Sequence, residues 1–129
     1  MDFPFDVSKI KMLLAEDDEL NRKMMTAIFS KFGLTPDIAK NGLEVLERLN
    51  DNVYDLILMD MSMPVMDGIQ ATVKIREMEK QTGSHIIIIA VTANASRDDI
   101  DRCYQAGMDD FITKPIKIDE MLQIIKKNT

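Results

Sequence analysis

Short apolar runs alternate with amphipathic segments five times along this chain of 129 residues. Each apolar run has the length of a strand, and the segments between them carry apolar residues at helical spacing. In the first such segment, this spacing places Leu20, Met24, Ala27 and Ile28 on one stripe, which is expected to face the core. Strands that alternate with helices build a parallel sheet covered by helices on both faces. The chain is therefore predicted to be an α/β protein. Its strands are expected at 12–15, 34–39, 56–59, 86–91 and 110–113, and its helices at about 19–32, 41–49, 67–80, 96–106 and from 118 onwards.

The composition of the strands also predicts their order in the sheet. The first, third and fourth strands are nearly continuous apolar runs, as expected of strands buried on both faces. The second contains Pro36 and the fifth is mixed in polarity, which fits the two edges. This arrangement matches the flavodoxin-like (βα)5 fold, a doubly wound parallel sheet with strand order 2-1-3-4-5. In that order, ligands bind at the carboxyl ends of the first and third strands.

Polar side chains follow four of the predicted strands at their carboxyl ends. They are Glu16 and Asp17 after the first strand, Asp60 after the third, Thr92 after the fourth and Lys114 after the fifth. Taken singly, they also fit ordinary roles, as acids at a helix start, a helix N-cap and a surface lysine. Together they place three carboxylates in one crevice, where like charges repel. A hard divalent cation such as Mg²⁺ relieves that repulsion, and it suits carboxylates, waters and phosphate oxygens.

Asp60 is the candidate nucleophile of this crevice. A carboxylate can attack phosphorus and form an acyl phosphate. Lys114 offers a compact positive charge to the transferring oxygens, and Pro115 keeps the chain at that point extended. Thr92 can donate a hydrogen bond to a phosphoryl oxygen. These residue types predict a phosphoryl-transfer site.

Four motifs resemble, in order and spacing, the motif set of response-regulator receiver domains of two-component signalling systems. Each motif alone is weak, whereas the four together are highly specific. They are Glu16-Asp17 after an apolar strand, 59–68 (MDMSMPVMDG), 91–95 (VTANA) and 111–115 (FITKP). The resemblance covers about residues 9–127, so residues 1–129 are expected to form a single receiver domain.

The resemblance implies a metal site and a phosphoacceptor. Asp60 would accept the phosphoryl group and also bind Mg²⁺. Asp17 would be a direct Mg²⁺ ligand, and Glu16 would assist through water. The backbone carbonyl of Ser62 would be a further ligand. Glu16 stands where many members of the family carry Asp, and its longer side chain alters the expected ligand geometry.

The resemblance also implies a switch and a set of partners. Thr92 and Lys114 would contact the phosphoryl group, and Phe111 would occupy the aromatic switch position. The phosphoryl group would come from a phosphohistidine on a sensor histidine kinase or a histidine phosphotransfer protein. The domain would be a signalling phosphoacceptor that assists only its own phosphorylation and dephosphorylation. Its switched surface, formed by the last two helices and the fifth strand, would bind a partner or a second copy of the chain.

The composition argues against several other classes of protein. The chain has 22 acidic and 16 basic residues, and a net charge of −6 argues against non-specific binding to nucleic acid. The longest apolar run, 86–91, is too short to span a bilayer, and the N-terminus does not have the pattern of a signal peptide. The single cysteine, Cys103, fits a cytoplasmic location. Cys103 is expected to pack, His85 to lie in a loop, and the acids at 98–99 and 109–110 to be solvated.

Three alternatives share part of this pattern. A flavin-binding flavodoxin has the same sheet, but the acids after the first strand would repel a phosphate, and the chain has no Trp and two Tyr. An aspartyl-phosphate hydrolase of the haloacid dehalogenase type needs a second Asp two residues after the nucleophile, where this chain has Ser62. A purely structural interaction domain leaves the carboxylates unexplained. Within the receiver interpretation, a free-standing regulator and a hybrid-kinase receiver both remain open, and VTANA is similar to many hybrid-kinase receivers.

Overall fold

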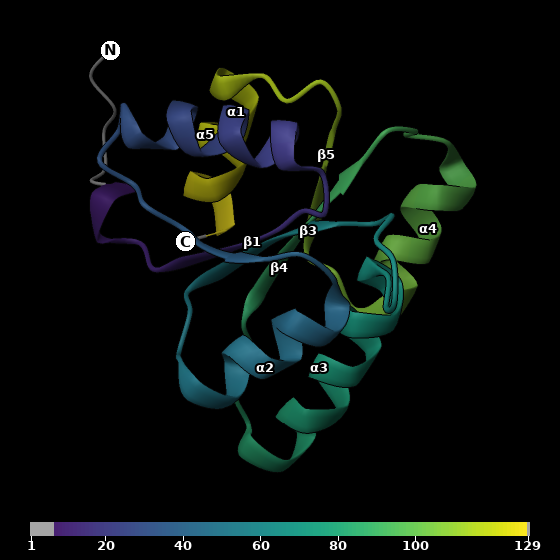
Figure 1. Cartoon of the computed structure of the whole chain (residues 1–129). Helices are drawn as coiled ribbons and strands as arrows, with labels where there is room; N and C mark the ends of the chain where they lie inside the picture. Colours follow the sequence, from purple (N-terminus) through teal and green to yellow (C-terminus); the bar gives the residue numbers. More distant parts are fainter. Residues whose placement is uncertain (1–6, 129) are drawn as a thin grey trace.

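The structure is a computed structural model that describes residues 7–128. Within these residues, a short 3₁₀ helix (Val7–Lys9) precedes five strands and five helices that alternate along the chain (Figure 1). The strands are β1 (Met12–Ala15), β2 (Asp37–Ala39), β3 (Leu56–Asp60), β4 (Ile87–Thr92) and β5 (Asp110–Thr113). The helices are α1 (Glu19–Ser30), α2 (Gly42–Asp51), α3 (Gly68–Thr82), α4 (Arg97–Ala106) and α5 (Ile118–Asn128).

The strands form one parallel sheet in the order β2-β1-β3-β4-β5, which confirms the predicted flavodoxin-like topology. Ala15 of β1 pairs with Met59 of β3, so the residues that follow this pair, Glu16 and Asp60, emerge side by side. On the other side of β3, Asp60 lies opposite Val91 of β4. The carboxyl ends of β1, β3 and β4 therefore meet at one edge of the sheet, where this fold binds its ligands.

Helices cover the sheet on both faces, and each face has its own core. Figure 1 shows α1 and α5 on one face and α2, α3 and α4 on the other. The first core joins the sheet to Met25, Phe29, Met121, Leu122 and Ile125 of α1 and α5. The second joins it to Val45, Ala71, Ile75 and Cys103 of α2, α3 and α4. Cys103 is thus a buried packing residue, as the sequence predicts.

Polar side chains begin four of the helices. Asp18, Asn41, Asp67 and Ser96 each accept a hydrogen bond from a backbone N–H of the first turn. Asp67 forms a full capping box with Gln70, which fixes where α3 begins. Within the described part of the chain, no helix is long and apolar enough to cross a membrane.

The predicted buried face of α1 was wrong. The sequence places Leu20, Met24, Ala27 and Ile28 on one apolar stripe, but Leu20 is 65% exposed and Met24 is 54% exposed. The helix instead buries Met25 and Phe29 against the sheet. Because apolar residues occur around much of this helix, periodicity alone could not decide which of them face the core.

The acids at 109–110, which the sequence treats as solvated, are engaged in the structure. Arg76 of α3 forms ion pairs with Asp109 (2.9 Å) and Glu79 (2.6 Å). Its guanidinium also donates to the carbonyl oxygens of Gly107 (2.9 Å) and Ile86 (2.8 Å). This network joins α3 to the segments that lead into β4 and β5, at the edge of the sheet away from Asp60.

Two neighbouring residues complete this correction. Asp110 is 8% exposed and accepts a hydrogen bond from Asn128 at the end of α5. His85, which does lie in a loop, places Nε2 2.7 Å from the Asp109 carboxylate.

Candidate functional site

Three carboxylates converge where β1 and β3 end. Ligand oxygens of Glu16, Asp17 and Asp60 all lie within 4.8 Å of one another. Glu16 and Asp60 are buried, with 2% and 4% of their surface exposed, whereas Asp17 is exposed. The predicted acid cluster is therefore present, and it has two buried members and one that faces solvent.

The loop after β1 is held by side chains of α1. Glu16 accepts hydrogen bonds from the Asp18 backbone N–H (3.3 Å) and from Nδ2 of Asn21 (3.2 Å). Arg22 donates to the carbonyl oxygens of Glu16 (3.0 Å) and Asp17 (2.7 Å). The Asp17 carboxylate itself makes no hydrogen bond or ion pair with residues 7–128, so its oxygens remain available to a ligand.

Asp60 is held on both carboxylate oxygens. The Ser62 backbone N–H donates to Oδ1 at 3.0 Å, and Lys114 Nζ donates to Oδ2 at 3.1 Å. Lys114 also lies 3.5 Å from Glu16. The backbone of Asp60 is packed against Gly68 so closely that a Cβ at position 68 would overlap the Asp60 carbonyl oxygen. The side chain thus has little freedom to move away from this position.

Lys114 reaches Asp60 because the chain after β5 is pinned to the end of β4. Its backbone N–H donates to the Thr92 carbonyl oxygen at 2.8 Å. Burial opposes a charged ammonium, but the Asp60 carboxylate outweighs it and holds the pKa of Lys114 above its ordinary value. Lys114 therefore carries a positive charge at physiological pH, beside the Asp60 carboxylate.

The surroundings of Glu16 displace its pKa. Burial, followed by the neighbouring Asp60 carboxylate, raises the pKa of Glu16 above its ordinary value. Carboxylates so close together favour a bound cation, and an all-oxygen donor set suits a hard divalent ion. The described residues therefore include a group of carboxylates that could hold a hard divalent cation.

Glu16→Gln is expected to stabilise the metal-free protein at neutral pH. A raised folded-state pKa means that ionised Glu16 costs folding free energy, and this cost disappears as the pH falls through that pKa and the carboxyl group is protonated. Gln keeps the shape and an acceptor oxygen without the charge. Urea unfolding without Mg²⁺ should show an advantage for the variant that shrinks from neutral to acidic pH. The exposed Glu77→Gln should show no such trend, and an advantage for Glu16→Gln that did not vary with pH would contradict the explanation.

Thr92 and Phe111 occupy the end of β4 and the start of β5. Thr92 is 6% exposed, and its hydroxyl donates to the Asn94 carbonyl oxygen at 2.8 Å. It therefore has to break a hydrogen bond with its own loop before it can donate to a phosphoryl oxygen. Phe111 is half-buried and packs edge-to-face on Tyr104 of α4, with ring centroids 6.5 Å apart.

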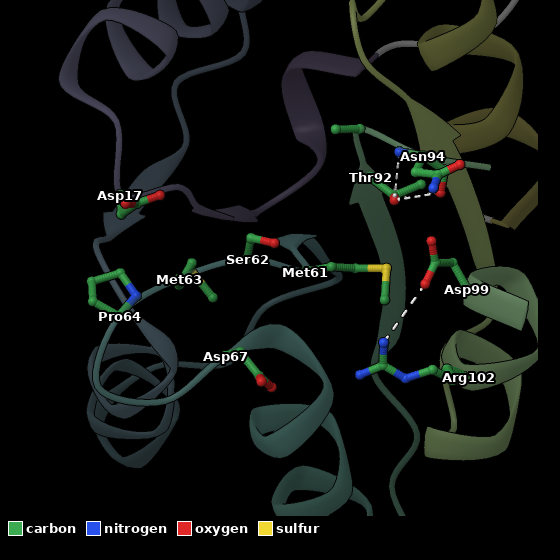
Figure 2. Close-up of a pocket in the computed structure, with 11 residues that line it drawn as sticks. Asp17, Met61, Ser62, Met63, Pro64, Asp67, Thr92, Asn94, Asp99 and Arg102 are labelled. Atoms are coloured by element: carbon green, nitrogen blue, oxygen red, sulfur yellow. Dashed lines mark hydrogen bonds and ion pairs between the residues drawn. The ribbon is translucent and has the colours of Figure 1, made fainter. Parts of the chain in front are cut away.

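A pocket of about 670 Å³ opens beside the phosphoacceptor candidate. Figure 2 shows its lining, which brings Asp17 together with the loop after β3, the loop after β4 and helix α4. Sequence reasoning missed three of its charged residues, Asp67, Asp99 and Arg102. Asp67 belongs to a quoted motif, but no motif marks the other two, because only the packing of α4 brings them to the pocket.

Comparison with known proteins gives a family for this geometry. A family model described as "Response regulator receiver domain" matches residues 12–126. The chain is 43% identical over 128 residues to hybrid signal transduction histidine kinase B of Dictyostelium discoideum, an alignment that covers 92% of this chain and 6% of the kinase. It is 42% identical over 126 residues to histidine protein kinase 1 of Candida albicans, covering 92% of this chain and 5% of that protein. The chain thus spans a small fraction of these relatives.

Solved structures of receiver domains are also similar to this chain. The receiver domain of the Saccharomyces cerevisiae response regulator Ssk1, in complex with the histidine phosphotransfer protein Ypd1, has a TM-score of 0.87 and 31% identity, over 92% of this chain and 88% of that one. The receiver domain of the sensor histidine kinase PA1611 of Pseudomonas aeruginosa has a TM-score of 0.82 and 36% identity, over 92% of this chain and 95% of that one. Its structure contains a magnesium ion coordinated in the active-site cleft. Because the family model matches nearly the whole chain and the relatives agree with it, the chain belongs to the response regulator receiver domain family.

Proposed function

We propose that Asp60 accepts a phosphoryl group from a phosphohistidine on a partner protein. The observation that carries this proposal is the double anchoring of the Asp60 carboxylate by Ser62 and Lys114, within 4.8 Å of two further carboxylates. A carboxylate oxygen of Asp60 attacks phosphorus, the bond from phosphorus to the imidazole nitrogen breaks, and the nitrogen leaves with the electron pair. Lys114 neutralises charge on the transferring oxygens.

The proposed cofactor is Mg²⁺, held at the carboxylate cluster. Asp17 and Asp60 would supply carboxylate ligands, Glu16 would act through water, and Ser62 would contribute its backbone carbonyl. When bound, the ion neutralises the cluster and the incoming phosphoryl oxygens. The magnesium ion in the cleft of the similar Pseudomonas receiver domain supports this assignment.

Asp17→Ala is expected to abolish Mg²⁺ binding and phosphorylation of the protein. The change removes the exposed ligand of the cluster and part of its mutual repulsion, so the metal-free variant should be at least as stable as the original protein. Titration calorimetry with Mg²⁺ and phosphorylation by acetyl phosphate measure the two effects. Asp99→Asn is the control, since Asp99 lines the same pocket outside the carboxylate cluster and should leave Mg²⁺ affinity unchanged. Normal Mg²⁺ affinity in Asp17→Ala would disprove the site.

The proposed donor is a histidine phosphotransfer protein or a sensor histidine kinase, in a relay in which this chain serves as the receiver of a hybrid kinase. The relatives are mostly hybrid kinases, and a similar receiver domain forms a complex with a phosphotransfer protein. Helix α1 supports such docking, because Leu20 and Met24 are exposed. Met24 and Ile28 also line a groove of about 370 Å³ that reaches Lys114. A partner seated on this apolar side of α1 would bring its histidine close to Asp60.

We further propose that phosphorylation shifts the surface formed by α4, β5 and α5, which binds the next partner or a second copy of the chain. The phosphoryl oxygens would draw the Thr92 hydroxyl away from the Asn94 carbonyl. Movement of Thr92 leaves space that the Phe111 ring can fill, and Phe111 is already coupled to α4 through Tyr104. Such a shift is a change in population between two states, driven by their different contacts with the phosphoryl group.

Amide chemical shifts should report this change when the phosphoryl mimic beryllium trifluoride is added with Mg²⁺. We expect perturbations at Thr92 and Asn94 that continue to Phe111 and along α4. Asp60→Asn is the control and should show none of them. Perturbations confined to the loops around Asp60 would instead favour a simple relay, in which the domain passes its phosphoryl group on without switching.

We propose that the domain returns to its resting state by slow to moderate self-hydrolysis. Ser62 and Asn94 stand two residues after Asp60 and Thr92, respectively, and neither side chain is an acid or a base. Neither can therefore activate a water molecule efficiently. The haloacid dehalogenase alternative is disfavoured for the same reason, because Ser62 replaces the general acid that such a hydrolase needs.

We propose that residues 1–129 form one receiver domain, with its core at about 9–127.

A further inference from the structure

The pocket beside Asp60 extends well beyond the groups that would bind a phosphoryl group and Mg²⁺. It runs from Asp17 and Ser62 to Asp99 and Arg102 on α4, and its volume of about 670 Å³ exceeds what a phosphoryl group alone requires. Three of its lining residues are acids, whereas Arg102 is the one cation among the described residues that line it. Lys114 lines a different groove, on the α1 side. An anionic phosphodonor whose phosphoryl group lies at Asp60 and Lys114 therefore finds Arg102 as the cation that lines the rest of this pocket.

Arg102 is only loosely held by its neighbours. It forms an ion pair with Asp99, with Nη1 3.6 Å from Oδ1, a separation too long for a hydrogen bond. Within residues 7–128 its guanidinium makes no hydrogen bond, whereas Arg76 uses its guanidinium in a network of ion pairs and carbonyl contacts. Figure 2 shows the Arg102 side chain reaching from α4 into the space between that helix and the loop after β3. The N–H groups of the Arg102 guanidinium thus face the pocket without a hydrogen-bond partner among residues 7–128.

We propose that Arg102 recognises the leaving group of acyl phosphates, and thereby sets which small phosphodonors this domain accepts; this inference rests on the proposed role of Asp60. When an Asp60 oxygen attacks the phosphorus of an acyl phosphate, the bond from phosphorus to the acyl oxygen breaks. The oxygen leaves with the electron pair as a carboxylate, without a proton. A guanidinium matches a carboxylate with two parallel hydrogen bonds, so Arg102 stabilises the negative charge as it forms.

Phosphoramidate provides a matched comparison. It transfers the same phosphoryl group to the same oxygen, but its already protonated nitrogen leaves as neutral ammonia. No negative charge develops on that leaving group, so Arg102 has nothing to stabilise. Loss of Arg102 should therefore slow transfer from acetyl phosphate much more than transfer from phosphoramidate. A residue that affected only folding, Mg²⁺ binding or the phosphoryl group itself would change both donors equally.

The test measures second-order rate constants of phosphorylation at saturating Mg²⁺ by intact-protein mass spectrometry. Arg102→Ala should lower the constant for acetyl phosphate about five- to tenfold, the effect of one charge-assisted contact made by an exposed side chain. It should change the constant for phosphoramidate by less than about twofold. Arg102→Lys keeps the charge but lacks the planar guanidinium that forms two parallel hydrogen bonds. Its rate constant for acetyl phosphate should therefore be intermediate. Arg97→Ala removes the same charge from an exposed position of α4 outside the pocket, and it should change neither constant by more than about twofold.

Two results would overturn the assignment of Arg102. One is a rate constant for acetyl phosphate in Arg102→Ala that equals that of Arg97→Ala. The other is an equal fall for both donors, which would place Arg102 in binding of the phosphoryl group and not of the leaving group. Asp60→Asn tests the proposed function separately from the role of Arg102. If phosphorylation persists in that variant, Asp60 is not the acceptor, whatever the rate constants of Arg102→Ala show.

Discussion

Asp60→Asn is expected to abolish phosphorylation of the protein and to leave its fold intact. The amide of Asn has nearly the same shape and can still accept the hydrogen bond from Ser62, but it is a poor nucleophile and cannot form a stable acyl phosphate. Loss of the charge also relieves repulsion with Glu16, which offsets the loss of an ionic partner for Lys114. Incubation with Mg²⁺ and acetyl phosphate should add one phosphoryl group to the original protein and none to the variant, as read by intact-protein mass spectrometry.

Asp67→Asn is the matched control for this experiment. Asp67 lines the same pocket, but its carboxylate caps α3 by accepting the Gln70 backbone N–H at 2.8 Å. Asn caps helices about as well as Asp, so the variant should keep both its stability and its phosphorylation. A phosphoryl group that still appeared on Asp60→Asn would show that another residue is the acceptor.

The position of the site could be predicted because it depends on the backbone alone. In a parallel sheet, the carboxyl ends of the strands share one edge, so the residue after each apolar run can be placed without knowing any side-chain contact. Glu16, Asp17 and Asp60 meet in the structure for that reason, and Lys114 joins them from the end of β5. The register of the pairing, with Ala15 opposite Met59, comes from the structure, because the order of the strands does not determine it.

Features that depend on how helices turn and pack could not be predicted in this way. The prediction of which side of α1 is buried was wrong because Leu20 and Met24 are apolar, as Met25 and Phe29 are. Only contact with the sheet distinguishes the two pairs. The place of Arg102 in the pocket follows from the packing of α4, which no local motif encodes.

The acids at 109–110 illustrate the same limit for charge. An Asp-Asp pair two residues after Gly107 has the pattern of a solvated turn, and the partner of Asp109 lies 33 residues earlier in the chain, on α3. A single sequence carries no signal that links Arg76 to Asp109 over that distance. The structure shows instead that this ion pair ties α3 to the start of β5, which makes it a candidate for a large contribution to stability.

Arg76→Ala is expected to lower the free energy of unfolding by about 2–4 kcal/mol, because it removes one member of a half-buried charge network and leaves its partners behind. The Arg76 side chain is 16% exposed, and the variant would leave the carboxylates of Glu79 and Asp109 facing each other without the shared cation. The carbonyl oxygens of Gly107 and Ile86 would lose their guanidinium donors as well. Urea unfolding followed by circular dichroism gives the free energy, and the site around Asp60, at the other edge of the sheet, should still bind Mg²⁺ in the folded fraction.

Lys74→Ala supplies the comparison on the same helix. Lys74 is exposed two residues before Arg76, so its replacement should change the free energy of unfolding by less than about 0.5 kcal/mol. Arg76→Lys should recover only part of the loss, since one ammonium cannot bond both carboxylates and both carbonyl oxygens at once. If Arg76→Ala and Lys74→Ala unfolded at the same urea concentration, the ion pairs of Arg76 would contribute nothing to the free energy of unfolding. In that case, only apolar contacts, such as those of Ile75, would hold α3 to β4 and β5.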